Sequence, residues 1–156
     1  MADTDLYYCY SQIAVFSPVL SHPFNDWSDR QVRQGFAWRR HSVSFRMLNE
    51  EGQCRVSVKV GSTYVPNPSA KRALVVPFDL DGSEVEIGSI TDSRRFEVPP
   101  GQYALYFEVG EDEKFVTWAL LSFVPQATVD ARILVEDQGI SPEYPLDMAA
   151  KPAGIA

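Results

Sequence analysis

The stretch Gln53-Cys-Arg-Val-Ser-Val-Lys-Val60 carries the clearest structural pattern of the chain. Apolar side chains occupy every second position from Cys54 to Val60, and the residues between them are polar or charged. Successive side chains of a β-strand point to opposite faces, so this alternation predicts a strand with one buried face and one face in water.

The same alternation recurs in short segments separated by glycine and proline. We expect strands over residues 5–16, 42–48, 53–60, 72–78, 85–90, 95–98, 102–109, 115–124 and 131–136. The turn formed by residues 49–52 is short enough to join 42–48 and 53–60 in a hairpin. Strands spaced about 8–12 residues apart predict a mostly-β fold, an antiparallel β-sandwich or a barrel-like domain.

One short helix is expected after the first strand. Asp26 and Ser28 are capping residues at its start, and Gly35 is a stop signal at its end. At about two turns, such a helix is too short to be stable alone. We therefore expect it to pack on the edge of the sheet through Trp27 and Val32.

The length of 156 residues suits one domain with its own core. We assign residues 1–137 to this β-sandwich-like domain and expect residues 138–156 to form an extended or mobile Pro-rich C-terminal tail. The chain begins without a basic, apolar leader, and it has no run of about 20 apolar residues. We therefore expect a cytoplasmic protein with no membrane insertion.

The net charge of −7 combines two regions of opposite sign. Residues 30–72 carry nine bases against two acids, whereas residues 73–113 carry ten acids against two bases. Nucleic-acid binding requires a surplus of Lys and Arg, so we expect no direct nucleic-acid binding. Residues 73–113 can form a negative surface for a partner, although charged strand faces that only keep the protein soluble explain the same count.

The sequence contains no recognisable catalytic or metal-binding motif. Cys9, Cys54, His22 and His41 lack the spacing of zinc ligands, and no nucleophile elbow or phosphate-binding loop is present. We interpret the two cysteines as small buried side chains, with a single disulfide or a reactive thiol as alternatives. We therefore expect no cofactor, no resident metal and no enzymatic activity.

The acids around the turn at Asp81 suggest a second type of site. Asp79, Asp81 and Glu84 alternate before or beside a glycine, as in a calcium loop, but they lack the twelve-residue register of an EF-hand. A hairpin turn with solvated acids explains the same residues. A calcium- or carbohydrate-dependent ligand-binding β-sandwich module therefore stays open as the alternative function.

Several short motifs follow one another along the chain. They are Asp26-Trp-Ser-Asp29, Gly35-Phe-Ala37, Ser42-Val-Ser-Phe45, Val76-Pro-Phe78, Val85-Glu-Ile-Gly-Ser-Ile90 and Pro99-Pro-Gly-Gln-Tyr-Ala-Leu105. This series resembles the competence protein J family, the DNA-entry nuclease inhibitors, over about residues 6–124. The resemblance implies a compact β-rich protein without catalytic activity that binds and inhibits a partner nuclease, often one encoded nearby. Residues 50–72 and the tail after Gln138 depart from the family pattern.

The resemblance and the charge pattern together suggest a binding surface. A nuclease active site is a cleft made positive for phosphate, so an acidic protein surface can occupy it by charge complementarity. We expect the contact on acidic turns of residues 73–113, at two hairpins that we place next to each other. The predicted partner-binding residues are Asp79, Asp81, Glu84 and Glu86, then Glu111, Asp112 and Glu113, with Tyr106 as an aromatic anchor.

Overall fold

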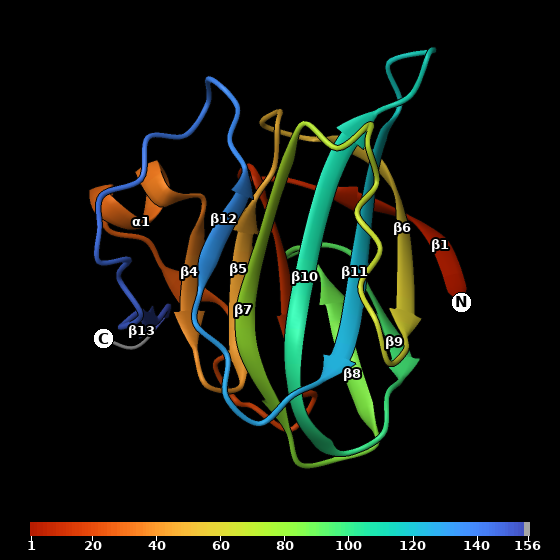
Figure 1. Cartoon of the computed structure of the whole chain (residues 1–156), viewed down its shortest axis with the longest axis vertical. Coiled ribbons are helices and arrows are strands. Elements are labelled where there is room, and N and C mark those ends of the chain that lie inside the picture. The colour runs from red at the N-terminus through yellow and green to blue at the C-terminus, as the bar shows by residue number, and fades with distance from the viewer. Residues whose placement is uncertain (155–156) are drawn as a thin grey trace.

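The computed structural model describes residues 1–154, whose two large β-sheets pack face to face (Figure 1). Sheet A has the strand order β1-β6-β11-β10-β7-β12, and sheet B has the order β4-β5-β2-β8-β9. The strands of sheet A are β1 (Ala2–Tyr8), β6 (Gly52–Val60), β7 (Arg72–Leu80), β10 (Gly101–Glu111), β11 (Thr117–Pro125) and β12 (Arg132–Val135). Those of sheet B are β2 (Gln12–Phe16), β4 (Phe36–Arg39), β5 (Ser42–Arg46), β8 (Glu84–Gly88) and β9 (Ser93–Glu97). The many strands confirm the expected mostly-β fold. Neither of the two sheets closes on itself, so the fold is a sandwich and not a barrel.

The core lies between the two sheets. The rings of Phe45 on β5 and Phe107 on β10 stack across it, with their centroids 4.4 Å apart and nearly parallel. In β6, Cys54, Val56 and Val58 are buried as the alternation of the sequence predicted. Burial of such aliphatic and aromatic side chains is the main favourable contribution to folding.

The expected hairpin between residues 42–48 and 53–60 is wrong. β5 pairs with β2 and β4 in sheet B, whereas β6 pairs with β1 and β11 in sheet A. The intervening turn therefore crosses from one sheet to the other. The β6–β11 pair is also parallel, while the other strand pairs are antiparallel.

The first expected strand, over residues 5–16, is two strands in different sheets. β1 ends at Tyr8 and β2 begins at Gln12. Between them, Tyr10 and Ser11 have φ values of 57° and 56°, in the left-handed region that few non-glycine residues adopt. This tight turn redirects the chain from sheet A to sheet B, and alternation of apolar residues does not reveal it.

The expected helix is present as α1 (Asp29–Gln34). The Ser28 side chain accepts a hydrogen bond from the backbone of Gln31, whose own side chain accepts one from the Ser28 N–H, and Gly35 ends the helix at φ 92°. The expected contact through Val32 is wrong, because Val32 is exposed and the helix buries Gln31 and Gln34 instead. Within residues 1–154, no helix is long and apolar enough to cross a bilayer.

The described part of the expected tail, residues 138–154, lies along α1 and sheet B (Figure 1). Ile140 is buried, and the Gln34 amide forms hydrogen bonds with the backbone N–H and C=O of Asp147. The short strand β13 (Lys151–Pro152) then pairs with β3 (Asn25–Asp26). Ile155 and Ala156, the last two residues of the expected tail, lie outside the described residues.

Candidate partner-binding surface

The structure separates the predicted acidic residues into two groups at opposite ends of the sandwich. Asp79 of β7 lies opposite Gln102 near the start of β10, whereas Glu111 is the last residue of β10. At about 3.3 Å per residue along a strand, these two positions are about 30 Å apart. The expectation that the two hairpins are neighbours is therefore wrong, because β10 runs the length of the sheet between them.

Two of the acids near the β7–β8 turn are paired with basic side chains of the chain itself. Asp79 accepts a hydrogen bond from Arg40 Nε at 2.8 Å. Glu86 lies on β8, where one carboxylate oxygen is 3.2 Å from Arg95 Nε. The charges of Asp79 and Glu86 are therefore balanced locally, and these side chains add little to a negative surface.

The other two acids of this group, Asp81 and Glu84, are exposed at the turn itself. Asp81 lies 3.8 Å from the Nε2 atom of His41, and no basic side chain of the described residues pairs with Glu84. Across residues 1–154, no group of three or more His, Cys, Asp or Glu side chains is arranged to hold a metal ion. This turn crosses from β7 in sheet A to β8 in sheet B, and its acids Asp81 and Glu84 are exposed to solvent.

Tyr106 lies on the outer face of sheet A, under a segment of chain that crosses this face. Residues 61–71 run over β10 and β11 (Figure 1), and the ring of Tyr64 stacks on Tyr106 with centroids 3.8 Å apart. The backbone N–H of Asn67 donates to Glu108 Oε2 at 2.7 Å, which fastens the segment further along. Burial, and then the Glu108 carboxylate, raise the pKa of the Tyr64 hydroxyl. Tyr106 is therefore half-buried and already covered on one face, which sequence reasoning did not foresee.

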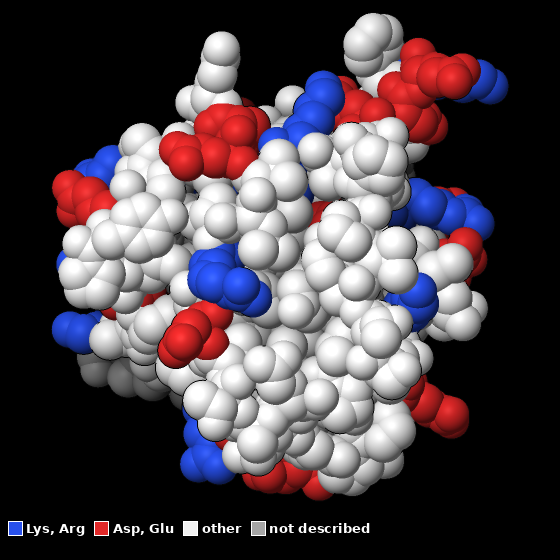
Figure 2. Space-filling model, in the orientation of Figure 1, with Lys and Arg blue, Asp and Glu red and all other residues white. Residues whose placement is uncertain are grey.

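The second predicted group belongs to a larger acidic region. The turn before β6, the β10–β11 hairpin and the end of β12 all lie at the same end of sheet A, because β6 and β11 are parallel and β12 is antiparallel to β7. Figure 2 shows acidic side chains gathered along this upper edge. We call this region the acidic end, and its acids are Glu50, Glu51, Glu111, Asp112, Glu113, Glu136 and Asp137.

The acidic end keeps an excess of negative charge. Lys71 pairs with Glu111 at 2.9 Å and Arg72 pairs with Asp137 at 2.6 Å. Among the described residues, no basic side chain forms an ion pair with the remaining five acids of the region. All five are exposed. Sequence reasoning missed Glu50, Glu51 and Glu136 because they lie outside the acidic block of residues 73–113.

The β10–β11 hairpin also presents an exposed aromatic side chain within the acidic end. Phe115 is 81% exposed and has φ 62°, although the sequence placed it in a buried strand that in fact begins at Thr117. One carboxylate oxygen of Asp112 accepts hydrogen bonds from the backbone N–H groups of Lys114 and Val116, at 2.8 and 2.9 Å. Asp112 therefore shapes the turn that holds Phe115 in solvent. Non-glycine residues in this strained backbone region often occur at functional sites.

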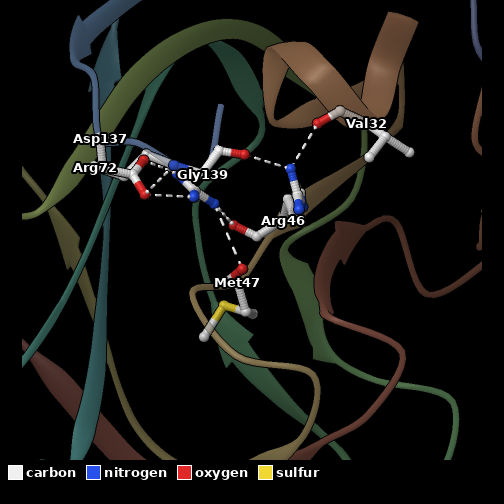
Figure 3. A network of polar contacts seen from close by, with 6 residues as sticks. All are labelled: Val32, Arg46, Met47, Arg72, Asp137 and Gly139. Atoms are coloured by element: carbon white, nitrogen blue, oxygen red, sulfur yellow. Dashed lines mark hydrogen bonds and ion pairs between the residues drawn. The ribbon is translucent and has the colours of Figure 1, made fainter. Parts of the chain in front are cut away.

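A buried arginine holds the end of β12 against the sandwich (Figure 3). Arg72 is 2% exposed, and its Nε and Nη2 atoms donate to the two carboxylate oxygens of Asp137 at 2.6 and 2.9 Å. Its Nη1 atom donates to the carbonyl of Arg46 at 2.8 Å. Burial raises the pKa of Asp137, but Arg72 and the Gly139 N–H outweigh that effect and leave this pKa below its usual value. Arg72 thereby positions the neighbouring Glu136 at the acidic end.

Comparisons with known proteins agree with this architecture. The family model described as Competence protein J (ComJ) matches residues 5–124. The chain is similar to the DNA-entry nuclease inhibitor of Bacillus subtilis (strain 168), with 28% identity over 97 residues that cover 62% of this chain and 72% of that protein.

Two solved structures have a similar fold. The crystal structure of ComJ, inhibitor of the DNA degrading activity of NucA, from Bacillus subtilis, superposes with a TM-score of 0.72 at 22% identity, over 81% of this chain and 96% of that one. The crocagin biosynthetic gene J protein gives a TM-score of 0.53 at 15% identity, over 81% of this chain and 100% of that one. The family model spans well over half of the residues, and the resemblance read from the sequence motifs is thereby confirmed: the chain belongs to the competence protein J family.

Proposed function

We propose that this chain is a non-catalytic inhibitor that binds a DNA-degrading nuclease and blocks it with the acidic end. Family membership and the description of the Bacillus subtilis relative as a nuclease inhibitor support the class of partner. The observation that carries the choice of surface is the convergence of three separate segments, each with unpaired acids, on one end of sheet A.

The physical basis is competition with DNA for a positive cleft. A nuclease attracts the phosphate backbone with basic side chains, and a protein surface rich in carboxylates is attracted by the same field. Such complementarity mainly increases the association rate and excludes wrong partners. The same negative charge repels DNA, so the inhibitor does not bind the substrate that it protects.

Phe115 supplies the apolar contact that charge alone lacks. Binding energy in protein interfaces concentrates in a few large side chains, often aromatic ones surrounded by polar groups. Phe115 projects from the hairpin with Asp112 and Glu113 beside it. We place Glu111, Asp112, Glu113 and Phe115 at the centre of the contact.

The acids at the opposite end have a different place in this proposal. An interface of standard size covers about 800 Å² on each partner, a patch about 30 Å across. A contact centred on the Phe115 hairpin therefore does not extend to Asp81 and Glu84. Contact of the partner with Asp79, Asp81, Glu84, Glu86 and Tyr106 stays a separate prediction from the sequence. The two exposed acids of this set, Asp81 and Glu84, provide a matched control.

The test compares two double charge reversals in an assay of DNA cleavage by the NucA-like nuclease of the organism that encodes this chain. Glu113→Lys with Glu136→Lys changes the acidic end, and Asp81→Lys with Glu84→Lys makes the same change of charge at the other end. We expect the first pair to lower the association rate at low salt about ten-fold or more, and the second to change it about two-fold or less. Equal effects of the two pairs would show that net charge, and not this surface, governs binding.

A further inference from the structure

A groove of about 570 Å³ lies next to the acidic end, where the link between β1 and β2 approaches α1. Its lining combines apolar side chains with one arginine and one amide. The lining includes Tyr10, Gln12, Trp27, Val32, Arg46 and Ile90. This groove is not formed by any of the residues that the sequence predicted as partner-binding.

The rim of the groove is apolar and exposed to solvent. Tyr10 is 71% exposed and Ile90 is 54% exposed, and Val32 lies beside them on the outer side of α1. Single exposed apolar residues are common, but several around one concave site are typical of a surface that another molecule covers.

The rim is also held rigidly. Tyr10 and Ser11 both adopt left-handed backbone angles, and the Ser11 N–H donates to the carbonyl of Glu50 at 2.7 Å. On the other side, Trp27 Nε1 donates to Gln12 Oε1 at 3.1 Å. The backbone that carries Tyr10 and the side chain of Trp27 are therefore positioned before a partner arrives, which lowers the entropic cost of binding.

Arg46 adds a charge to this apolar site. Its Nη1 atom donates to the carbonyls of Val32 and Gly139, at 3.2 and 2.6 Å, which fixes the guanidinium at the groove (Figure 3). Within residues 1–154, no carboxylate lies within ion-pair distance of Arg46. A fixed guanidinium with unused donors is well suited to a carboxylate from another molecule.

We propose that the groove is the second half of the nuclease interface and takes an apolar side chain flanked by a carboxylate from that nuclease. This inference rests on the proposed function. Continuity supports the choice of occupant, because the Ser11–Glu50 hydrogen bond joins the groove to the acidic end. The acidic end attracts the basic cleft of the nuclease. The groove, through Arg46, recognises a carboxylate of the nuclease outside that cleft, and this second contact distinguishes the nuclease from other basic proteins.

The test uses full-length variants and the same nuclease. Tyr10→Asn removes the ring and keeps a residue that tolerates left-handed backbone angles, and Ile90→Ser removes an exposed apolar side chain. The control is Val19→Ser, since Val19 is 89% exposed and follows β2 at the end of sheet B away from the groove. We expect each groove variant to increase the dissociation rate about ten-fold, with little change in the association rate, and the control to change neither by more than about two-fold.

Arg46 gives a separate measurement of the carboxylate contact. Arg46→Gln removes the charge and Arg46→Lys keeps it, so binding by Arg46→Gln is expected to be weaker than binding by Arg46→Lys. Both variants lose the hydrogen bonds from Arg46 to the backbone carbonyls of Val32 and Gly139. Urea unfolding of both variants shows whether this loss has changed the stability of the fold. Equal binding by the two variants would contradict a carboxylate in the groove.

The outcomes separate this inference from the proposed function. If the wild-type chain does not inhibit the nuclease, the proposed function fails and the inference fails with it. If inhibition is present and sensitive to the acidic-end reversals, but unchanged by Tyr10→Asn and Ile90→Ser, only the groove assignment is overturned. A dimer in sedimentation velocity that Ile90→Ser dissociates would identify a second copy of the chain as the occupant, and would also overturn it.

Discussion

The Arg72→Met variant tests how the chain holds the end of β12 in place. Arg72 is 2% exposed and its partner Asp137 is 22% exposed, so the variant leaves a largely buried carboxylate without its counter-charge. It also removes the hydrogen bond to the carbonyl of Arg46. Removing one partner of a fully buried ion pair costs about 3–5 kcal/mol, and partial access of water to Asp137 reduces this, so we expect a loss of about 2–4 kcal/mol.

Urea unfolding followed by tryptophan fluorescence measures this loss directly, since Trp27, Trp38 and Trp118 lie in different parts of the fold. In a thermal melt of a domain this size, the same loss corresponds to roughly 5–15 °C. The matched control is Lys71→Met, which breaks the neighbouring ion pair with Glu111. That lysine is half-exposed, so the expected cost is about 1 kcal/mol or less.

The pH dependence supplies a second measurement. The folded-state pKa of Asp137 lies below its usual value, because Arg72 and the Gly139 N–H outweigh the effect of burial. A carboxyl group of this kind adds stability above its unfolded pKa of about 4, and this stability is lost as the pH falls through the folded pKa. The wild-type chain should therefore lose stability below about pH 4 more steeply than Arg72→Met does. If Arg72→Met is as stable as Lys71→Met, and loses stability below about pH 4 as steeply as the wild-type chain, the role given to Arg72 is refuted.

Three further predictions concern other parts of the fold. Gly110→Ala should cost about 1–3 kcal/mol in urea unfolding, because a Cβ atom there would lie 2.6 Å from the Trp118 ring, and an unaffected Gly110→Ala would contradict this packing. Gly82→Ala, where a Cβ atom meets nothing within 4 Å, is its control. Burial, with the nearby Asp5 charge, raises the pKa of the Cys54 thiol to about 12, so a thiol reagent at pH 8 should label Cys9 in the native protein and Cys54 only after unfolding. Added calcium should leave the melting temperature unchanged, whereas a clear upward shift would favour the alternative ligand-binding function of Asp79, Asp81 and Glu84.

The strands could be predicted from the sequence because alternation reports burial on one face of a strand. Cys54, Val56 and Val58 are buried as expected. The strand partners could not be predicted in this way. Two strands that face each other across the core show the same alternation of apolar residues as two strands that are hydrogen-bonded side by side. The sequence therefore predicted a hairpin of β5 and β6, although these strands lie in different sheets.

The surface could be predicted only in part, for a related reason. Hairpin strands carry neighbouring stretches of sequence to opposite ends of a sheet, so the acidic block of residues 73–113 divides between two ends. The parallel β6–β11 pair and the β7–β12 pair bring Glu50 and Glu136 to the same end of sheet A as the Phe115 hairpin, and these pairs join distant parts of the sequence. Phe115 itself was assigned to a strand because its apolar character alone does not distinguish a buried position from a hairpin tip.

The most direct test of the proposed function is DNA cleavage by the NucA-like nuclease in the presence of increasing amounts of this chain. We predict that cleavage falls in proportion to the added chain and ceases near equimolar amounts. We also predict that Glu113→Lys with Glu136→Lys makes inhibition set in about ten-fold more slowly at low salt, while Asp81→Lys with Glu84→Lys changes its onset about two-fold or less. Undiminished cleavage at a micromolar excess of the wild-type chain would contradict the account.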